Sequence, residues 1–419
     1  MPCPDRLSQW SQQVSTAFAH LSKPQVWGLV LWSAGITQIS ALLSLVLEQE
    51  EQTVFQRLRE WYLDAKHKSG KKRRELDVAS CFAPLLCWMV RLWEKGNQQM
   101  VLVLDATTLG ERWTILSISV VVRSCAIPVA WKVLGGHEKG SWRPHWEGLL
   151  KSLEGSIPAD WQVLVLADRG LYARWLFQAI CACGWHPFLR INLGVKARAV
   201  GEESFDWISR WTPVPGTSWK GTVECFVGKA SRLTCTLLMH WEAGYEHPWA
   251  VLTDLKPEEA EVSWYGMRTW IETGFKDFKR GLWGWHHSKM QEASRVERLW
   301  LAMAVAQVWT VSVGCQAEEK LRQGSSGERL PAQHIASRRR KRPADQPPTR
   351  RLSCVVRGRL GLVAALFKAE VLPCGRLLAE AWPETITSPR KLPSASALHQ
   401  RERKRAQKRR ARARARTAA

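Results

Sequence analysis

Two apolar runs that each end in an aspartate constrain the fold of this chain more than any other feature. The runs are Val101–Asp105 and Val163–Asp168. Their length and their Val and Leu content are typical of strands covered on both faces, and open α/β sheets carry their chemistry at the carboxyl ends of such strands. We therefore expect Asp105 and Asp168 to end two strands of one sheet. For Asp168 an alternative stays open, because an aspartate also caps a helix that follows it.

A third acidic residue, Glu272, lies on a segment that the sequence predicts to be helical, from Tyr265 to Lys279. Its apolar residues recur at steps of three or four, at Met267, Ile271, Phe275 and Phe278. Tyr265, Arg268 and Glu272 share that spacing, so they project from one face, and Lys279 follows close to it. A carboxylate beside a phenol, a guanidinium and an ammonium suits a metal ion held next to phosphates. The alternative is a solvated helix face with ordinary ion pairs.

These residues carry a resemblance to a known family. Asp105, Asp168 and Glu272 resemble the acidic triad of the DDE transposases encoded by bacterial insertion sequences. The subgroup with a Tyr-x2-Arg-x3-Glu-x6-Lys signature is matched without a gap, by Tyr265, Arg268, Glu272 and Lys279. Asp168–Tyr172 also resembles the second-aspartate motif of that subgroup. The resemblance covers roughly residues 98 to 314.

The resemblance implies an enzyme for cut-and-paste DNA transposition, acting by phosphodiester hydrolysis, hairpin formation at the freed ends and strand transfer. Three converging carboxylates repel one another unless cations lie between them, so Asp105, Asp168 and Glu272 are expected to hold two Mg²⁺ ions, with Mn²⁺ as a substitute. Arg268 and Lys279 would clamp phosphates. Tyr265 would hydrogen-bond a phosphate near the terminal nucleotide.

An insertion tryptophan stacks on a flipped base in the related transposases. Trp241 and Trp249 are the candidates here, and the alternative for each is an ordinary core residue.

The predicted fold class is α/β, and the resemblance implies a ribonuclease-H-like core interrupted by a small β insertion. The expected elements are strands at 113–122, 127–134, 188–191 and 249–255, and helices at 141–153, 172–183 and 295–313. The expected regions are a helical N-terminal part (1–97), a first core segment (98–191), the insertion (192–248), a second core segment with the Glu272 helix (249–314) and a basic C-terminal part (315–419). Within the last, 352–381 could form one or two helices that serve dimerisation.

The charge of the chain is concentrated at its C-terminal end. The formal net charge is +23, and the residues from Arg338 onward hold 23 Lys and Arg against 5 Asp and Glu, a net +18. Such a tail is typical of polyanion binding, and a solvated run is the alternative. A second basic stretch, Lys66–Arg74, is either a DNA contact or an exposed linker.

The remaining features fit a cytosolic protein. The 11 cysteines lack zinc-type spacing and are expected to be reduced thiols. Residues 24–47 lack charges, but their polar interruptions favour a buried helix over a membrane span. The resemblance implies a bacterial cytoplasmic, nucleoid-associated protein that acts on double-stranded DNA, namely the terminal inverted repeats of the element and its target, as a homodimer without a membrane. Two other classes remain open: a nuclease of the same fold, and a non-catalytic DNA-binding protein derived from a transposase.

Overall fold

The computed structural model describes residues 12–20, 40–41, 43–45, 48–68, 73–138, 140–242, 245–323, 352–368 and 370–383. Most of the stretch 24–47, in which a buried helix was expected, lies outside these ranges. So do four residues of the basic stretch Lys66–Arg74 and the whole of the Arg-rich tail beyond Pro383.

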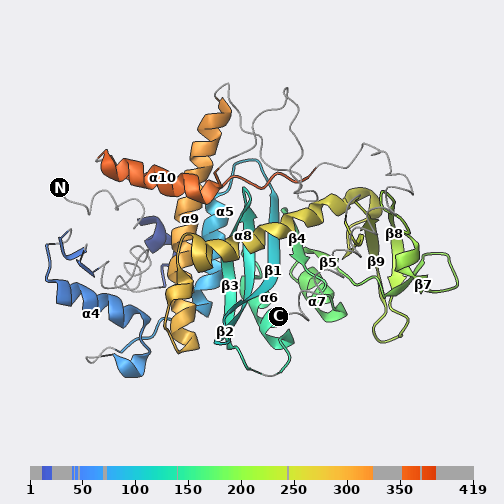
Figure 1. Ribbon diagram of the computed structural model, residues 1–419, viewed down its shortest axis with the longest axis horizontal. Coiled ribbons are helices and arrows are strands. Elements are labelled where there is room, and N and C mark those ends of the chain that lie inside the picture. The colour runs from blue at the N-terminus through green and yellow to red at the C-terminus, as the bar shows by residue number, and fades with distance from the viewer. Residues whose placement is uncertain are drawn as a thin grey trace, which may run out of the picture.

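Within the described residues, ten strands form one mixed sheet, in the order β3-β2-β1-β4-β5-β10-β9-β8-β6-β7 (Figure 1). In chain order the strands are β1 Gln99–Leu109, β2 Trp113–Val122, β3 Cys125–Gly135, β4 Gln162–Ala167, β5 His186–Arg190, β6 Lys196–Ala199, β7 Asp206–Trp207, β8 Ser218–Cys225, β9 Leu233–His240 and β10 Trp249–Thr253. The predicted α/β class is confirmed, because helices flank this sheet.

The first half of the sheet follows the predicted order of elements. Strands β2 and β3 form a hairpin whose turn, Arg123-Ser124, has φ of 47° and 64°. Two consecutive residues with positive φ make the turn whose twist matches the flanking strands. Strand β1 then pairs parallel with β4, and β4 pairs parallel with β5. Helices α6 (Arg143–Leu153) and α7 (Arg174–Ala182) make these parallel connections.

The segment expected as a β insertion continues the same sheet. Strand β10 pairs with β5 on one side and with β9 on the other, and β8 pairs with β9 along eight residues. The inner positions of β9 are buried, as they are in the strands of the first half. Hydrogen bonding therefore runs without a break from the β2–β3 hairpin to β7.

A long helix, α9 (Ala293–Gln323), packs against β3 and extends beyond the expected boundary at Gly314. Its stretch Ala293–Lys320 is long and apolar enough to cross a membrane, but 78% of its most apolar window is buried inside the protein. Such burial is typical of a core helix of a soluble fold. Helix α8 (Trp270–Lys276) lies against β1, β2 and β3.

The described residues of the C-terminal part beyond α9, 352–368 and 370–383, pack on this core. A single helix, α10 (Cys354–Phe367), packs on α9, where a side chain at Gly358 would meet the carbonyl oxygen of Thr310. The extended segment 370–383, which we call the strap, follows α10. Its Leu377 bridges to Trp93, and its Trp382 ring packs edge-on against Trp264 at 4.6 Å.

The described residues of the N-terminal part include two long helices, α4 (Glu51–Tyr62) and α5 (Phe82–Leu92), within the two runs where helices were expected. It is joined to α9 by Arg298, a side chain with 2% exposure. Arg298 donates to the backbone oxygens of Tyr62 and Leu76 and to the carboxylates of Asp64 and Glu75. The two ends of the basic stretch are thereby fixed to the start of the core helix.

Candidate active site

Asp105 and Asp168 lie at the same level of the sheet. Leu104 of β1 pairs with Ala167, the last residue of β4, so the next residue on each strand is one of the two acids. Asp168 does not cap α7, because that helix begins at Arg174 with Ala173 as its N-cap. The Asp168 carboxylate instead accepts a hydrogen bond from the backbone of Arg169 at 2.7 Å. The two acids are therefore adjacent, as expected. The expectation that Asp105 ends its strand is wrong, because β1 continues to Leu109 by antiparallel pairing with β2.

Glu272 reaches this edge on a helical run that changes geometry twice. The run consists of a 3-10 helix over Val262–Thr269, then α8, then a π-helical turn over Asp277–Gly281. Its four expected apolar residues are all buried, so the predicted face against the sheet is confirmed. Gly274 explains how close the run lies, because a Cβ there would be 2.8 Å from the carbonyl oxygen of Ala126 on β3.

Arg268 connects the three acids. Its Nη2 donates to Asp105 Oδ2 at 2.6 Å and lies 3.6 Å from Asp168 Oδ2. Its Nη1 donates to Glu272 Oε1 at 2.8 Å. The Arg268 side chain is 14% exposed and that of Glu272 is 64% exposed. On this helix face Arg268 is therefore turned toward the sheet, and Glu272 is turned toward solvent. The alternative of a wholly solvated helix face does not describe this arrangement.

The protonation equilibria of the site follow from burial and charge. Burial raises the pKa of Asp105, and the nearby Arg268 only partly offsets it. For Arg268, burial lowers the pKa, but Asp105 and the other acidic groups outweigh it, so the net pKa is raised. Burial also raises the pKa of Tyr265, whose hydroxyl donates to Asp168 Oδ1 at 3.4 Å. Arg268 and Tyr265 are thus held in their protonated forms beside the acids.

A pocket of about 400 Å³ opens beside the acids. Its lining contains Asp105, Ala106, Glu272, Phe275, Lys276, Lys279 and Arg280. Lys279 thus lines the same pocket as Glu272, as its place in the signature predicts. Its pKa is lowered, first by burial and then by the neighbouring Arg280. The lining thus combines two carboxylates with three basic side chains, which is the set of charges needed to hold cations and phosphates side by side.

Sequence reasoning missed three cations of this site. Lys276 and Arg280 belong to the helical run but not to the signature. Arg190 lies 3.9 Å from Asp168 Oδ1. A signal for Arg190 was present, because it closes the apolar strand β5, which is parallel to β4 and ends at the same edge.

The two candidate tryptophans have different surroundings. Trp249, the first residue of β10, is half-buried and its ring meets the Tyr265 ring edge-on at 5.1 Å. Trp241 follows β9, and its Nε1 donates to the carbonyl oxygen of Tyr245 at 3.1 Å. Trp249 therefore contacts a residue of the site.

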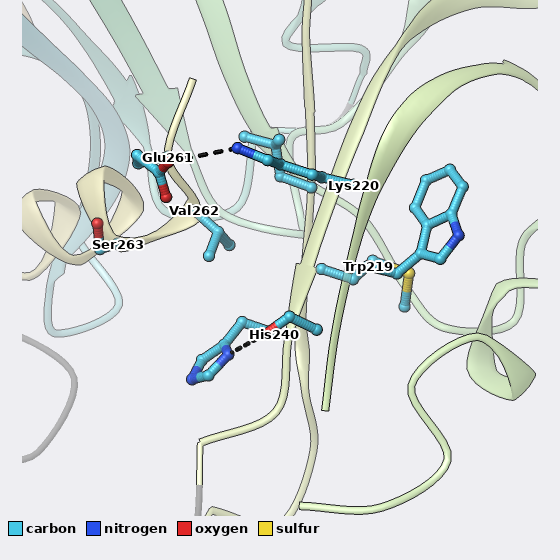
Figure 2. A pocket seen from close by; sticks show the side chains of 9 residues that line it. Trp219, Lys220, His240, Glu261, Val262 and Ser263 are labelled. Carbon is cyan, nitrogen blue, oxygen red and sulfur yellow. Dashed lines mark hydrogen bonds and ion pairs between the residues drawn. The ribbon is translucent and has the colours of Figure 1, made fainter. Parts of the chain in front are cut away.

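A second pocket of about 270 Å³ lies between β8, β9 and the start of the 3-10 helix (Figure 2). On its walls Ser218 Oγ lies 2.7 Å from His240 Nδ1, and Lys220 pairs with Glu261 at 3.4 Å. Its polar groups are thus paired with one another, and none of the three acids lines it. We assign the chemistry to the pocket beside the acids because converging carboxylates and cations lie there.

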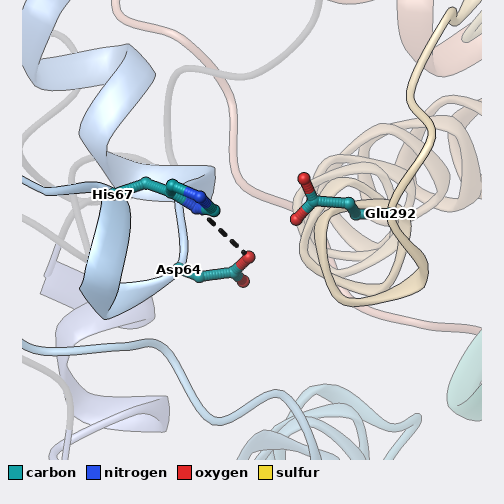
Figure 3. A group of neighbouring side chains, drawn as sticks. All are labelled: Asp64, His67 and Glu292. Carbon is teal, nitrogen blue, oxygen red and sulfur yellow. Dashed lines mark ion pairs between the residues drawn. The ribbon is translucent and has the colours of Figure 1, made fainter.

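A separate group of side chains could hold a metal ion. The ligand atoms of Asp64, His67 and Glu292 all lie within 4.8 Å of one another, with Asp64 and His67 facing Glu292 across the junction with α9 (Figure 3). It is the one such group among the described residues. Both carboxylates already pair with arginines, Asp64 with Arg298 and Glu292 with Arg295 at 2.9 Å. No sequence signal could identify it, because Glu292 is remote from the other two in the chain.

The sequence was compared with models of protein families and with curated proteins, and it matches none of them.

Proposed function

We propose that this chain is a DDE transposase of a bacterial insertion sequence, with β1 to β5 and α6 to α8 as a ribonuclease-H-like core and β6 to β9 as its insertion. The observation that supports this most directly is the meeting of Asp105, Asp168 and Glu272 at one guanidinium, from two adjacent strands and one helical run. The Tyr-Arg-Glu-Lys spacing of that run supports the same proposal.

The donor set of the site fits hard divalent cations. All three acids offer carboxylate oxygens, which Mg²⁺ and Mn²⁺ prefer, and an oxygen of each lies within 3.6 Å of a nitrogen of Arg268. These three oxygens are not all within 4.8 Å of one another, so the acids would have to draw together around an ion. Asp105, Asp168 and Glu272 would hold the ions. When bound, the ions would neutralise charge at the scissile phosphate and favour the ionised form of the attacking hydroxyl.

The other residues act on the DNA itself. Lys276, Lys279 and Arg280 line the open side of the pocket, where they attract the phosphodiester backbone. Arg268 can grip two phosphate oxygens through its fork. Tyr265 is held in place by the Trp249 ring and by Asp168, which supports a role for its hydroxyl in binding a phosphate next to the acids. Together these contacts align a phosphodiester with the acids.

The proposal includes the partners and the location of the protein. The substrates are the terminal inverted repeats of the element and a target duplex, both double-stranded DNA, engaged by a homodimer in the bacterial cytoplasm at the nucleoid. The net +18 of the residues from Arg338 onward supports DNA as the partner.

The test uses purified full-length protein and a duplex that carries the inverted repeats flanking its coding sequence. We expect Mg²⁺-dependent cleavage at the repeat ends and joining of the cleaved ends to a plasmid. An Asp105→Ala variant serves as the inactive control. Cleavage without end preference or joining would favour a nuclease, and end binding without cleavage would favour a non-catalytic derivative.

A further inference from the structure

We infer that Arg268 makes cation binding by the three acids conditional on DNA. In the free protein its guanidinium occupies the carboxylate oxygens of the acids, and it leaves them when a phosphate binds. The inference rests on the proposed function and adds to it a control of that same site. It concerns when the acids become available, which the signature alone does not address.

The first step is steric and electrostatic. One guanidinium contacts all three acids, with Nη2 between Asp105 and Asp168 and Nη1 on Glu272. A magnesium ion lies about 2.0–2.1 Å from each oxygen that it binds. The nitrogens of Arg268 take that space, and the positive charge of Arg268 repels a second cation at a site where burial weakens solvent screening.

The second step is that a phosphate offers the guanidinium an equivalent partner. The fork of arginine matches phosphate as well as carboxylate. The pocket beside Asp105 and Glu272 carries Lys276, Lys279 and Arg280, which bring phosphates to its mouth. Arg268 holds the acids through its Nη atoms, whereas its Nε is buried without a hydrogen-bond partner. A turn of the guanidinium toward a phosphate therefore releases the acids without breaking a bond at Nε.

The third step is linkage. If a phosphate competes with the acids for Arg268, DNA must raise the affinity of the acids for cations, and cations must raise the affinity for DNA by the same factor. The free protein would then hold divalent cations weakly, and cleavage competence would arise only on bound DNA.

The experiment measures Mn²⁺ affinity by electron paramagnetic resonance of the free ion, with the full chain and with or without a short blunt-ended DNA duplex. Ions bound by the duplex alone are subtracted. The variants are Arg268→Ala and Arg268→Gln, which remove the charge, and Arg268→Lys, which keeps it. Arg198→Gln is the matched control, because Arg198 is a half-buried arginine of β6 that pairs with Glu224 at 2.6 Å and with none of the three acids. The double variant Asp105→Asn/Asp168→Asn defines binding elsewhere, including at Asp64, His67 and Glu292.

We expect Arg268→Ala and Arg268→Gln to raise the Mn²⁺ affinity of the DNA-free protein by about tenfold or more. Arg268→Lys and Arg198→Gln should stay within about threefold of the unchanged protein. The duplex should raise the affinity of the unchanged protein and leave that of Arg268→Gln nearly constant. Equal DNA-free affinities for the unchanged protein and folded Arg268→Gln would overturn the inference. Absence of any binding beyond the double Asn variant, with or without duplex, would instead overturn the proposed metal-dependent function.

Discussion

Asp105 and Asp168 stand level on adjacent parallel strands, because Leu104 pairs with Ala167 immediately before them. This pairing runs along all of β4 and along residues 99–104 of β1, so it fixes the spacing of the two acids more firmly than a loop would.

Replacing Asp105, Asp168 or Glu272 by Ala should reduce single-turnover cleavage of a repeat-end duplex by at least about 10³-fold. End binding, measured by gel shift in Ca²⁺, should change little because phosphate contacts come from the basic side chains. Asp160→Ala is the matched control, because Asp160 pairs with Gln98 before the two strands begin. Near-normal cleavage by any one of the three variants would remove that residue from the triad.

Gly274→Ala should loosen the helical run that carries Glu272. The new Cβ would approach the Ala126 carbonyl oxygen to 2.8 Å, so α8 must shift, at a cost of about 1–3 kcal/mol in the free energy of unfolding. The cleavage rate should fall by more than the loss of folded protein alone would cause, because Glu272 moves with the helix. Gly148→Ala, in open space on α6, should be neutral or slightly stabilising in urea denaturation. Equal effects of the two substitutions would contradict the close contact.

Asp277→Asn should stabilise the protein in a pH-dependent way. Burial raises the pKa of Asp277 to about 6, although Lys276 opposes the shift. Below the usual value of 3.8 the carboxyl is protonated in both folded and unfolded chains, so the substitution has its smallest effect there. As pH rises from about 4 to 6 the unfolded chain loses its proton first, and the unchanged protein loses about 1–2 kcal/mol relative to the variant, after a discount for partial exposure. Urea denaturation of both proteins across this window checks the slope; a constant difference would contradict a buried carboxyl.

The basic tail should be tested by ending the chain after Pro383, because an earlier end would remove α10 and the strap from the core. Residues 384–419 hold 12 Lys and Arg against 2 Asp and Glu, a net +10. Their removal should lower the affinity for non-specific duplex and flatten the slope of log affinity against log salt concentration. A charge-neutral tail of equal length is the control. An unchanged slope would show that these residues do not contact DNA.

Arg298→Ala should strongly lower the free energy of unfolding, because Arg298 joins the N-terminal part of the chain to α9. It leaves Asp64 and Glu75 without their cation and two backbone oxygens without a donor, at a cost of about 3–5 kcal/mol. Arg295→Ala, at a more exposed position on the same helix, should cost about 1 kcal/mol or less. Thermal unfolding of both variants measures the contrast. Similar losses of thermal stability in the two variants would mean that Arg298 contributes no more than one partner of a surface ion pair does.

The elements that the sequence predicts well are those defined by local pattern. The apolar runs of β1, β2 and β4 and the break at Arg123-Ser124 each contain their own signal. The helical signature indicates that Tyr265, Arg268 and Glu272 share a face. The contacts of Tyr265 and Arg268 with the two aspartates, and of Arg268 with Glu272, agree with that spacing. Local pattern was sufficient because each of these features is fixed within a few residues.

Pairings between distant segments could not be read in the same way. The joining of β10 to β5 and β9 depends on register that the sequence does not encode locally. The change from 3-10 to α to π geometry along Val262–Gly281 follows from contacts such as that of Gly274 with β3. The meeting of Asp64 with Glu292 likewise requires the folded interface.

The strap also sets the order in which the molecule can be completed on the ribosome. Its Trp382 ring packs against Trp264, the residue before Tyr265, and the carbonyl oxygen of Pro383 accepts a hydrogen bond from Ser263. Synthesis proceeds from the N-terminus, so all three acids emerge well before the strap. The 3-10 helix beside the acids lacks these two contacts until translation has passed Pro383. A nascent chain that has not yet reached Pro383 therefore carries all three acids without the contacts that the strap makes at Ser263 and Trp264.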